Sequence, residues 1–298
     1  MGRERNSWRV TANGRICPFK ERQTMFYCKM NGCGNDFIIL DNTDGSLNGY
    51  DFSAMAKELC HRRFSIGADG LMVVEPPRQG GNFSMRFYNS DGSLGEMCGN
   101  GARCICRYGF ESGYAGKVQQ VETTAGLVTG YQISRTDYKI RLNDPSVVRL
   151  GEEISIDGQT LQISYLELGR PGIPHAVVSL EEIGSPDRGE LLALGRKIRS
   201  YSGFQKGANV NFYRKTAEDA IELFTYERGV EDFTLACGTG SGSSALALLL
   251  QGILKGPDIR VKTEGGILTV GVDIQGDTLE NLWLTGPTKM VCRGEIID

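Results

Sequence analysis

The sequence lacks the features that mark several large classes of protein. No apolar run reaches the roughly 18 residues that a membrane-spanning helix needs, and the longest candidate, 245–250, is short. The 33 Lys and Arg residues are balanced by 36 Asp and Glu residues, so the chain has no basic excess suited to nucleic acid. We therefore expect neither a membrane nor nucleic acid among its partners.

Metal ligands in the usual spacings are also lacking. Histidine occurs only as His61 and His175, and no two cysteines have the Cys-x-x-Cys spacing. Protein metal sites usually contain such pairs or a histidine cluster. We therefore expect no metal site.

Cysteine, by contrast, is plentiful. The nine cysteines are an odd number in a chain of 298 residues, and no apolar signal-peptide core follows the arginine-containing start. We therefore expect a cytoplasmic location and no disulfide framework. The first 24 residues differ in composition from the rest, and we expect them to be a disordered or non-native extension before a folded region that starts at Met25.

An internal repeat is the most informative feature of the sequence. In the first half, Met-Arg-Phe-Tyr at 85–88 leads through a polar loop to Met-Cys-Gly-Asn-Gly at 97–101. In the second half, Leu-Phe-Thr-Tyr at 223–226 leads through another polar loop to Ala-Cys-Gly-Thr-Gly at 236–240. Each unit has the pattern strand, loop, Cys-Gly-x-Gly, helix. The repeat predicts two related domains that face each other, each with one cysteine at the cleft.

These two cysteines, Cys98 and Cys237, are candidates for proton transfer. A cysteine just before a helix lies in the positive field of the helix N-terminus, which favours the thiolate, and the free amides there can bind a carboxylate. Inversion of a stereocentre needs a base on one face and an acid on the other, and a thiol pKa of about 8.5 suits both roles. One copy of the motif could equally be a structural turn, whereas two equivalent copies favour chemistry.

The same motifs bear on cofactors. No lysine lies in either motif to hold pyridoxal phosphate as a Schiff base. We therefore expect cofactor-independent racemisation or epimerisation of a small amino-acid substrate.

From Met30 to the end, the motifs resemble those of the diaminopimelate epimerase family. The matching segments are Met-Asn-Gly-Cys-Gly-Asn-Asp-Phe at 30–37, Gly-Ala-Asp-Gly at 67–70, Asn-Ser-Asp-Gly-Ser at 89–93, Met-Cys-Gly-Asn-Gly-Ala-Arg at 97–103, Pro-His-Ala-Val at 174–177, Asn-Val-Asn-Phe at 209–212, Glu-Arg-Gly at 227–229 and Leu-Ala-Cys-Gly-Thr-Gly at 235–240. The resemblance implies an isomerase that interconverts LL- and meso-diaminopimelate in lysine biosynthesis, and it leaves a homodimer open.

The resemblance also implies roles for individual residues. Cys98 and Cys237 would be the two bases, and His175 would lie close to the site. The residues around the substrate would be Asn35, Asn89, Gly99, Asn100, Asn209, Glu227, Arg228, Gly238 and Thr239. Among these, Arg228, Asn89 and Asn209 would hold the distal carboxylate, Glu227 would lie near amino groups, and the amides that follow each cysteine would hold the reacting carboxylate.

The implied fold is α+β, with two pseudo-symmetric domains that each wrap a strongly curved sheet around a helix, and the active site in the cleft between them. The expected N-terminal domain spans 25–143 and is joined by the C-terminal tail at about 287–298. The expected C-terminal domain spans 144–286.

Departures from the family pattern concern the substrate and not the proton-transfer chemistry. Ile173 stands where the family usually has an asparagine that binds the distal end of the substrate, and Asn31 and Cys33 replace the usual His and Leu. Glu-Asp-Phe at 231–233 replaces a more usual glycine-bearing turn. A racemase of another amino acid on the same fold is therefore the alternative. A non-catalytic or thiol-redox protein is a more remote one.

Overall fold

A computed structural model describes residues 8–10, 16–18, 24–95, 98–184, 186–276 and 278–297. Near the N-terminus, β1 (Trp8–Val10) pairs with β2 (Ile16–Pro18). Most of the predicted extension at 1–24 lies outside the described residues. From β3 to β20, every strand belongs to one closed, hydrogen-bonded sheet.

The first half of this sheet is built from short strands with two helices between them. Its elements are β3 (Met25–Gly32), β4 (Asn35–Asp41), α1 (Phe52–Leu59), β5 (Gly70–Glu75), β6 (Phe83–Asn89), β7 (Leu94–Gly95), α2 (Gly99–Glu111), β8 (Val118–Thr123), β9 (Gly126–Gln132) and β10 (Asp137–Arg141). Helix α1 starts at a side-chain cap, because Asp51 accepts hydrogen bonds from the backbone N–H groups of Ser53 and Ala54.

The second half repeats this order. Its elements are β11 (Pro145–Ile156), β12 (Gln159–Leu168), β13 (Ile173–Ser179), α3 (Arg188–Arg199), β14 (Asn209–Ala217), β15 (Ala220–Glu227), β16 (Asp232–Thr234), α4 (Gly238–Leu250), β17 (Asp258–Thr263), β18 (Gly266–Gln275) and β19 (Thr278–Pro287), followed by β20 (Lys289–Ile296). Helix α3 begins with a capping box, in which Asp187 and Glu190 each accept a hydrogen bond from the other's backbone N–H.

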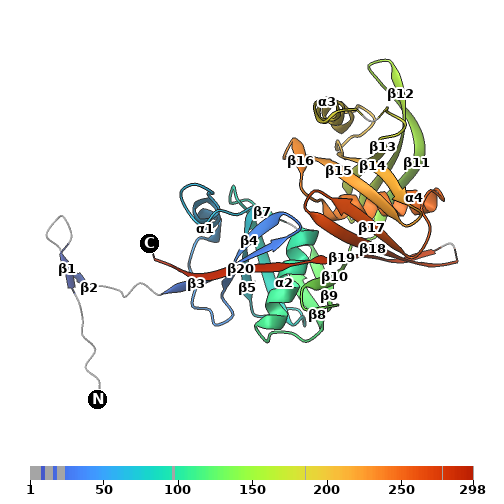
Figure 1. Ribbon diagram of the computed structural model, residues 1–298. Coiled ribbons are helices and arrows are strands. Elements are labelled where there is room, and N and C mark those ends of the chain that lie inside the picture. The colour runs from blue at the N-terminus through green and yellow to red at the C-terminus, as the bar shows by residue number, and fades with distance from the viewer. Residues whose placement is uncertain are drawn as a thin grey trace.

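The strand pairing shows that the two halves are equivalent. Strand β4 runs parallel to β5 and β13 runs parallel to β14, with Phe37 opposite Gly70 and His175 opposite Asn209. Each pair continues into an antiparallel third strand, β6 or β15, and then into the helix that carries the repeated motif. Figure 1 shows α2 in one lobe and α4 in the other, each beside its own curved set of strands.

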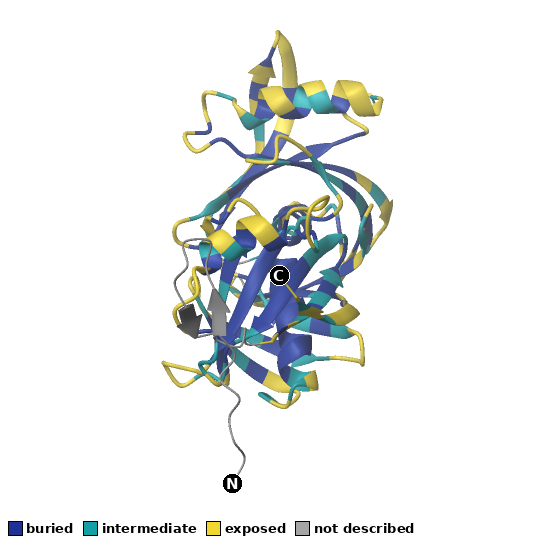
Figure 2. Cartoon of the chain, turned by 90° about the vertical axis from the view of Figure 1, so that its left-hand side faces the viewer, coloured by how far each residue is buried: buried dark blue, intermediate teal, exposed yellow. Residues whose placement is uncertain are grey.

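The core lies around these two helices. Almost every residue of α2 and α4 is buried, which is the expected pattern for a helix enclosed by other elements on all sides. Figure 2 shows the same distribution, with buried residues at the centre of the sheet and exposed residues on α3 and on the outer loops. The predicted α+β fold class, with a curved sheet around a helix in each of two related halves, is confirmed.

Two strands link the halves. Strand β19 pairs with β18 of its own half and with β10 of the first half, and β20 returns to pair with β3. The proposed division of the chain into domains near residue 144 stays a prediction.

Among the described residues, none of the helices has both the length and the apolar character that crossing a membrane requires.

Candidate active site

Both motif cysteines occupy the same structural position. Cys98 is the N-cap of α2 and Cys237 is the N-cap of α4, and both have extended backbone angles, with φ of −103° and −113°. Both thiols are free and half-buried. At Cys237, the sulfur accepts a hydrogen bond from the Gly240 N–H at 3.4 Å and lies 3.5 Å from the Thr239 hydroxyl. Each thiol therefore lies beside N–H groups that have no partner within the helix.

The two helices meet at their N-termini. A Cβ built on Gly99 would lie 3.7 Å from the Gly238 Cα, and one built on Gly238 would lie 3.5 Å from the Gly99 Cα. The fully buried Leu284 of β19 lies against both glycines, 3.2 Å and 2.8 Å from those Cβ positions. A Cβ at either position would make an ordinary van der Waals contact with the facing glycine, whereas one at Gly238 would force the Leu284 side chain to shift. The amide-rich first turns of both motifs therefore lie side by side.

Burial changes the acidity that the motif alone predicts. Burial raises the pKa of the Cys98 thiol, and the nearby Glu227 carboxyl raises it further. Burial and then Glu227 raise the pKa of Cys237 to about 12. The expectation that the helix N-terminus leaves a lowered thiol pKa is therefore wrong. The helix amides oppose this effect, but desolvation of the buried thiols outweighs them.

Asn35 and Asn100 form part of a hydrogen-bonded chain that joins the halves. Asn100 Nδ2 donates to Asn35 Oδ1 at 2.6 Å and to the backbone carbonyl of Ala236, next to Cys237, at 3.1 Å. Asn35 Nδ2 in turn donates to Asp69 Oδ2 at 3.1 Å, and Arg62 donates to the other Asp69 oxygen. Both amide side chains therefore have fixed orientations.

Asn209 and Arg228 also lie together. Asn209 Oδ1 accepts the Arg228 backbone N–H at 2.8 Å, and Asn209 Nδ2 donates to the Pro174 carbonyl at 3.2 Å. The Arg228 guanidinium donates to the Lys206 carbonyl at 2.7 Å. The half-buried Ile173 comes just before Pro174 at the start of β13. These contacts place Ile173, Asn209 and Arg228 on neighbouring segments.

His175 is fully buried and Glu227 is half-buried at this end of the second half. Burial lowers the pKa of His175 to about 3, and the Arg228 charge adds to this effect, so the ring is neutral. His175 Nδ1 lies 3.2 Å from the Asn211 amide, whereas Nε2 has no hydrogen-bond partner among the described residues. Burial also raises the pKa of Glu227, which accepts a hydrogen bond from the Thr234 hydroxyl.

Asn89 is the predicted site residue with the weakest connection to the others. It lies at the end of β6 and donates to the Ser93 hydroxyl at 2.9 Å in the turn that follows. Its partner across the strand pair is Gly70, which follows Asp69 of the hydrogen-bonded chain. The structure thus places Asn89 beside this chain through the sheet, with no direct side-chain contact to the chain among the described residues.

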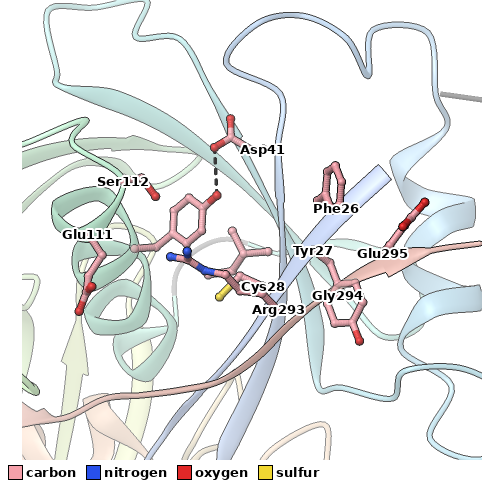
Figure 3. A pocket seen from close by; sticks show the side chains of 11 residues that line it. Phe26, Tyr27, Cys28, Asp41, Glu111, Ser112, Arg293, Gly294 and Glu295 are labelled. Atoms are coloured by element: carbon pink, nitrogen blue, oxygen red, sulfur yellow. Dashed lines mark hydrogen bonds between the residues drawn. The ribbon is translucent and has the colours of Figure 1, made fainter. Parts of the chain in front are cut away.

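A separate cavity of about 540 Å³ lies on the first half, away from both motifs. Figure 3 shows it between β3, β20 and the end of α2, with Asp41, Glu111 and Arg293 around it. Asp41 there accepts hydrogen bonds from the hydroxyls of Tyr108 and Tyr114.

Among the described residues, no group of three or more His, Cys, Asp or Glu side chains is arranged to hold a metal ion.

Sequence reasoning missed three residues that support the site. Leu284 lies between the helix ends, Asp69 holds the Asn35 amide, and Arg103 lies buried against Asn100. Asp69 and Arg103 belong to the segments that resemble the family, which is the only sequence signal for them. No sequence signal distinguishes Leu284, since it is one aliphatic residue among many in a strand.

Several solved structures share this fold. A probable proline racemase from Agrobacterium radiobacter is similar with a TM-score of 0.67 and 17% identity, and covers 92% of this chain and 93% of its own. A phenazine biosynthesis protein of the PhzF family from Bacillus anthracis has a TM-score of 0.66 and 16% identity, and covers 93% of this chain and 100% of its own. At these identities the likeness shows the fold alone.

Sequence comparison identifies the family. The diaminopimelate epimerase family model matches residues 27–145 and 170–291. A diaminopimelate epimerase from Aquifex aeolicus is 36% identical over 283 residues, covering 91% of this chain and 98% of the relative. One from Archaeoglobus fulgidus is 36% identical over 281 residues, covering 90% and 95%. The chain belongs to the diaminopimelate epimerase family, and the predicted family and enzyme class, an isomerase, are confirmed.

Proposed function

We propose that this protein interconverts LL- and meso-diaminopimelate by two-base proton transfer at the α-carbon, with Cys98 and Cys237 as the bases. The observation that carries the proposal is the meeting of the two helix N-termini, each capped by a motif cysteine. Lysine biosynthesis and a cytoplasmic location are part of the same proposal. A homodimer stays a prediction, which light scattering of the purified protein would test.

The paired helix ends suit an α-carboxylate. The first-turn N–H groups at Gly99, Asn100, Gly238 and Thr239 have no intrahelical acceptor, and both helix dipoles favour negative charge there. When a base removes the α-proton, negative charge moves onto the carboxylate oxygens, and these fixed donors stabilise it. One thiolate then takes the proton from one face while the opposite thiol gives a proton to the other.

The raised thiol pKa values set a condition on this chemistry. Both thiols favour the protonated form, because burial penalises the thiolate. A bound amino acid brings an α-ammonium group into the site, and that positive charge favours a thiolate beside it. We therefore infer that substrate binding and ionisation of one thiol are coupled, so that the reactive thiolate forms mainly when a substrate is present to use it.

Asn209 and Arg228 support a substrate with a second carboxylate. Arginine presents a planar fork that binds a carboxylate through two hydrogen bonds. A site built to pair with a polar group rejects analogues that lack it, because its own buried groups are then left unpaired. This favours diaminopimelate, which carries a carboxylate at each end, over an amino acid with a single carboxylate.

Ile173 favours a second candidate, a racemase of another amino acid. By strand register it is the counterpart of Asn35, since both lie two residues before the equivalent residues Phe37 and His175. An isoleucine cannot offer the hydrogen bonds of an asparagine. The substrate end that contacts the second half could therefore be less polar than in a diaminopimelate site.

Exchange of the α-hydrogen in D₂O separates the two candidates. LL-diaminopimelate, lysine, histidine and glutamate are each incubated with the enzyme, and deuterium incorporation is followed by mass spectrometry. We expect diaminopimelate to exchange fastest, and Ile173→Asn not to slow it. Faster exchange of an amino acid with only one carboxylate, together with a shift toward diaminopimelate in Ile173→Asn, would establish the second candidate. A thiol-redox protein would show no exchange with any of the four.

A further inference from the structure

The turn between β15 and β16 begins with two of the predicted substrate contacts, Glu227 and Arg228, and contains a residue in an unusual backbone conformation. Glu231 has φ of 58°, in the left-handed region that residues with a Cβ rarely adopt. In the corresponding turn of the first half, between β6 and β7, a glycine, Gly92, occupies this region. A glutamate in the second turn requires an explanation, because glycine would adopt the same conformation without strain.

Three hydrogen bonds reach the carboxylate of Glu231. Oε1 accepts from the Gly229 backbone N–H at 3.0 Å and from Arg199 Nε at 2.9 Å. Oε2 accepts from the hydroxyl of the fully buried Tyr226 at 3.1 Å. These donors hold the pKa of Glu231 below its ordinary value, with the Gly229 N–H as the largest contribution. The carboxylate therefore binds its own turn and the end of α3 at the same time.

Arg199, the last residue of α3, connects Glu231 to the segment 206–209, which leads into β14. The backbone carbonyl of Arg199 accepts the Ala208 N–H at 3.1 Å. Its guanidinium lies against Gly207, where a Cβ would come within 2.8 Å of Nη1. The ion pair between Glu231 and Arg199 therefore fixes the turn against this segment.

Arg228 depends on the same segment for its position. Its backbone N–H donates to Asn209 Oδ1 at 2.8 Å, and its Nη1 donates to the Lys206 carbonyl at 2.7 Å. These two acceptors flank the residues that contact the end of α3. The contacts thus form a closed ring, which runs from Glu231 through α3 and the segment to Arg228, and back along the turn. A guanidinium has several N–H donors, so the bond through Nη1 leaves others for a ligand.

We propose that Glu231 and Arg199 form a clamp that fixes Arg228 in the orientation needed to bind the distal carboxylate of the substrate. Glu231 is then a positioning residue, which acts on the substrate through the backbone of the turn. A donor that is already held in place loses less freedom when its ligand binds, so the clamp strengthens binding. The use of the clamp for diaminopimelate rests on the proposed function, whereas the clamp itself does not.

Glu227, on the same turn, has supports that do not involve the clamp. It pairs with Asp232 across β15 and β16, and its carboxylate accepts from the Thr234 hydroxyl at 2.9 Å. Its carbonyl also accepts the Glu231 backbone N–H at 2.8 Å, a bond that remains whatever side chain stands at 231. Loss of the clamp should therefore weaken substrate binding more than it slows proton transfer.

The second half contains a matched control for this clamp. Asp157, in the turn between β11 and β12, also has a left-handed backbone, with φ of 52°, and forms an ion pair with Lys197 of α3. This pair has the same chemical parts as the clamp, but it joins α3 to a different turn. Asp157→Gly and Lys197→Met therefore report the general effect of losing such a pair.

The test is the steady-state kinetics of LL-diaminopimelate epimerisation by the full-length enzyme. Glycine suits the left-handed conformation, so Glu231→Gly removes the carboxylate without adding strain and should fold. We expect its KM to rise about tenfold, the size of one hydrogen bond to a charged group, with kcat changed less than about threefold. Asp157→Gly should leave both constants unchanged.

Arg199→Met breaks the clamp from its other side and should raise KM by a similar factor, whereas Lys197→Met should not. The double variant Glu231→Gly with Arg199→Met should be no worse than either single variant, because each change already opens the same ring. Circular dichroism and thermal melting report whether each variant is folded. A role in stability alone would lower the melting temperature and leave KM unchanged.

Three results would overturn the proposal. KM could stay unchanged in Glu231→Gly, it could rise equally in Asp157→Gly, or the two single effects could multiply in the double variant.

A wild-type enzyme that does not epimerise diaminopimelate would refute the proposed function and leave the clamp to be tested without substrate. Amide hydrogen exchange, followed by mass spectrometry, then compares peptides that cover 206–209 and 227–231. We expect faster exchange in Glu231→Gly than in the wild type or Asp157→Gly, because the ring of contacts is open. Equal exchange in all three proteins would refute the clamp.

Discussion

The two halves of the molecule share a scaffold and differ in the residues that it carries. Strand order, parallel and antiparallel pairing and the position of the motif helix are the same in both. Yet Asn35 corresponds to Ile173, Phe37 to His175 and Arg103 to Gly242. The shared scaffold brings the two motif helices together at their N-termini. The differences give the two thiols unequal surroundings.

This comparison has a chemical meaning. An enzyme that inverts a stereocentre handles two mirror-related arrangements around one carbon, so two equivalent acid–base groups suit it. The rest of its substrate is not symmetric, so the remaining contacts should differ between the halves. The two halves should therefore be equivalent in proton transfer and differ in their other contacts.

The cysteines should be equally indispensable. We expect Cys98→Ala and Cys237→Ala each to lower the rate of epimerisation about 10³-fold or more, because general acid–base catalysis contributes about 10² to 10⁴ and each direction needs both groups. Steady-state assays with LL- and meso-diaminopimelate measure this loss. Cys292→Ala, at an exposed thiol, serves as the control. Near-normal turnover by either active-site variant would show that the halves are not equivalent in catalysis.

Leu284 should matter to both halves at once. Leu284→Ala should lower the free energy of unfolding by about 2–5 kcal/mol, the usual cost of a cavity in a packed core, and should also reduce kcat because the helix ends lose their common contact. Urea denaturation and kinetics report the two effects. The control is Leu282→Ala, since Leu282 is equally buried on the same strand but lies near Gly242 of α4. It should lose stability with a smaller change in kcat.

His175 should make the second half sensitive to acid. Its folded-state pKa, about 3, lies below the ordinary value of 6.5, so the unfolded chain binds the proton first as pH falls. Its contribution to stability is present above pH 6.5 and is lost as pH falls toward 3. Between pH 7 and about pH 5 this loss amounts to about 2 kcal/mol. Unfolding measured at both pH values should show a smaller decrease in His175→Gln, and an equal decrease would contradict the assignment.

Thr239 should have the smallest effect. Its hydroxyl lies 3.5 Å from the Cys237 sulfur and lowers the pKa of that thiol. Thr239→Ala should therefore slow alkylation of Cys237 about twofold to threefold at a fixed pH, the size expected for one weak hydrogen bond, and leave Cys98 unchanged. If both thiols slow equally, the two environments are more alike than the structure indicates.

The sequence alone was sufficient for the repeat, the two thiols and the family. The repeat could be read because Cys-Gly-x-Gly before a helix is a local pattern, and the structure places both cysteines at the predicted helix N-caps. The roles of the predicted substrate contacts stay predictions. The raised thiol pKa values could not be predicted from the sequence, because they depend on burial by strands distant in the sequence and on the charge of Glu227. The same reason hides Leu284, which matters only once both helix ends have met against it.

The return of β20 to β3 affects how the protein can be made. Strand β3 is among the first folded elements to leave the ribosome, but its partner spans residues 289–296. During synthesis, a nascent chain that has not reached these residues exposes the unpaired edge of β3, which can pair with another chain. The first half therefore completes its sheet only after the second half has been translated. Stalled or truncated chains should accordingly aggregate through β3, even when they contain both motif cysteines.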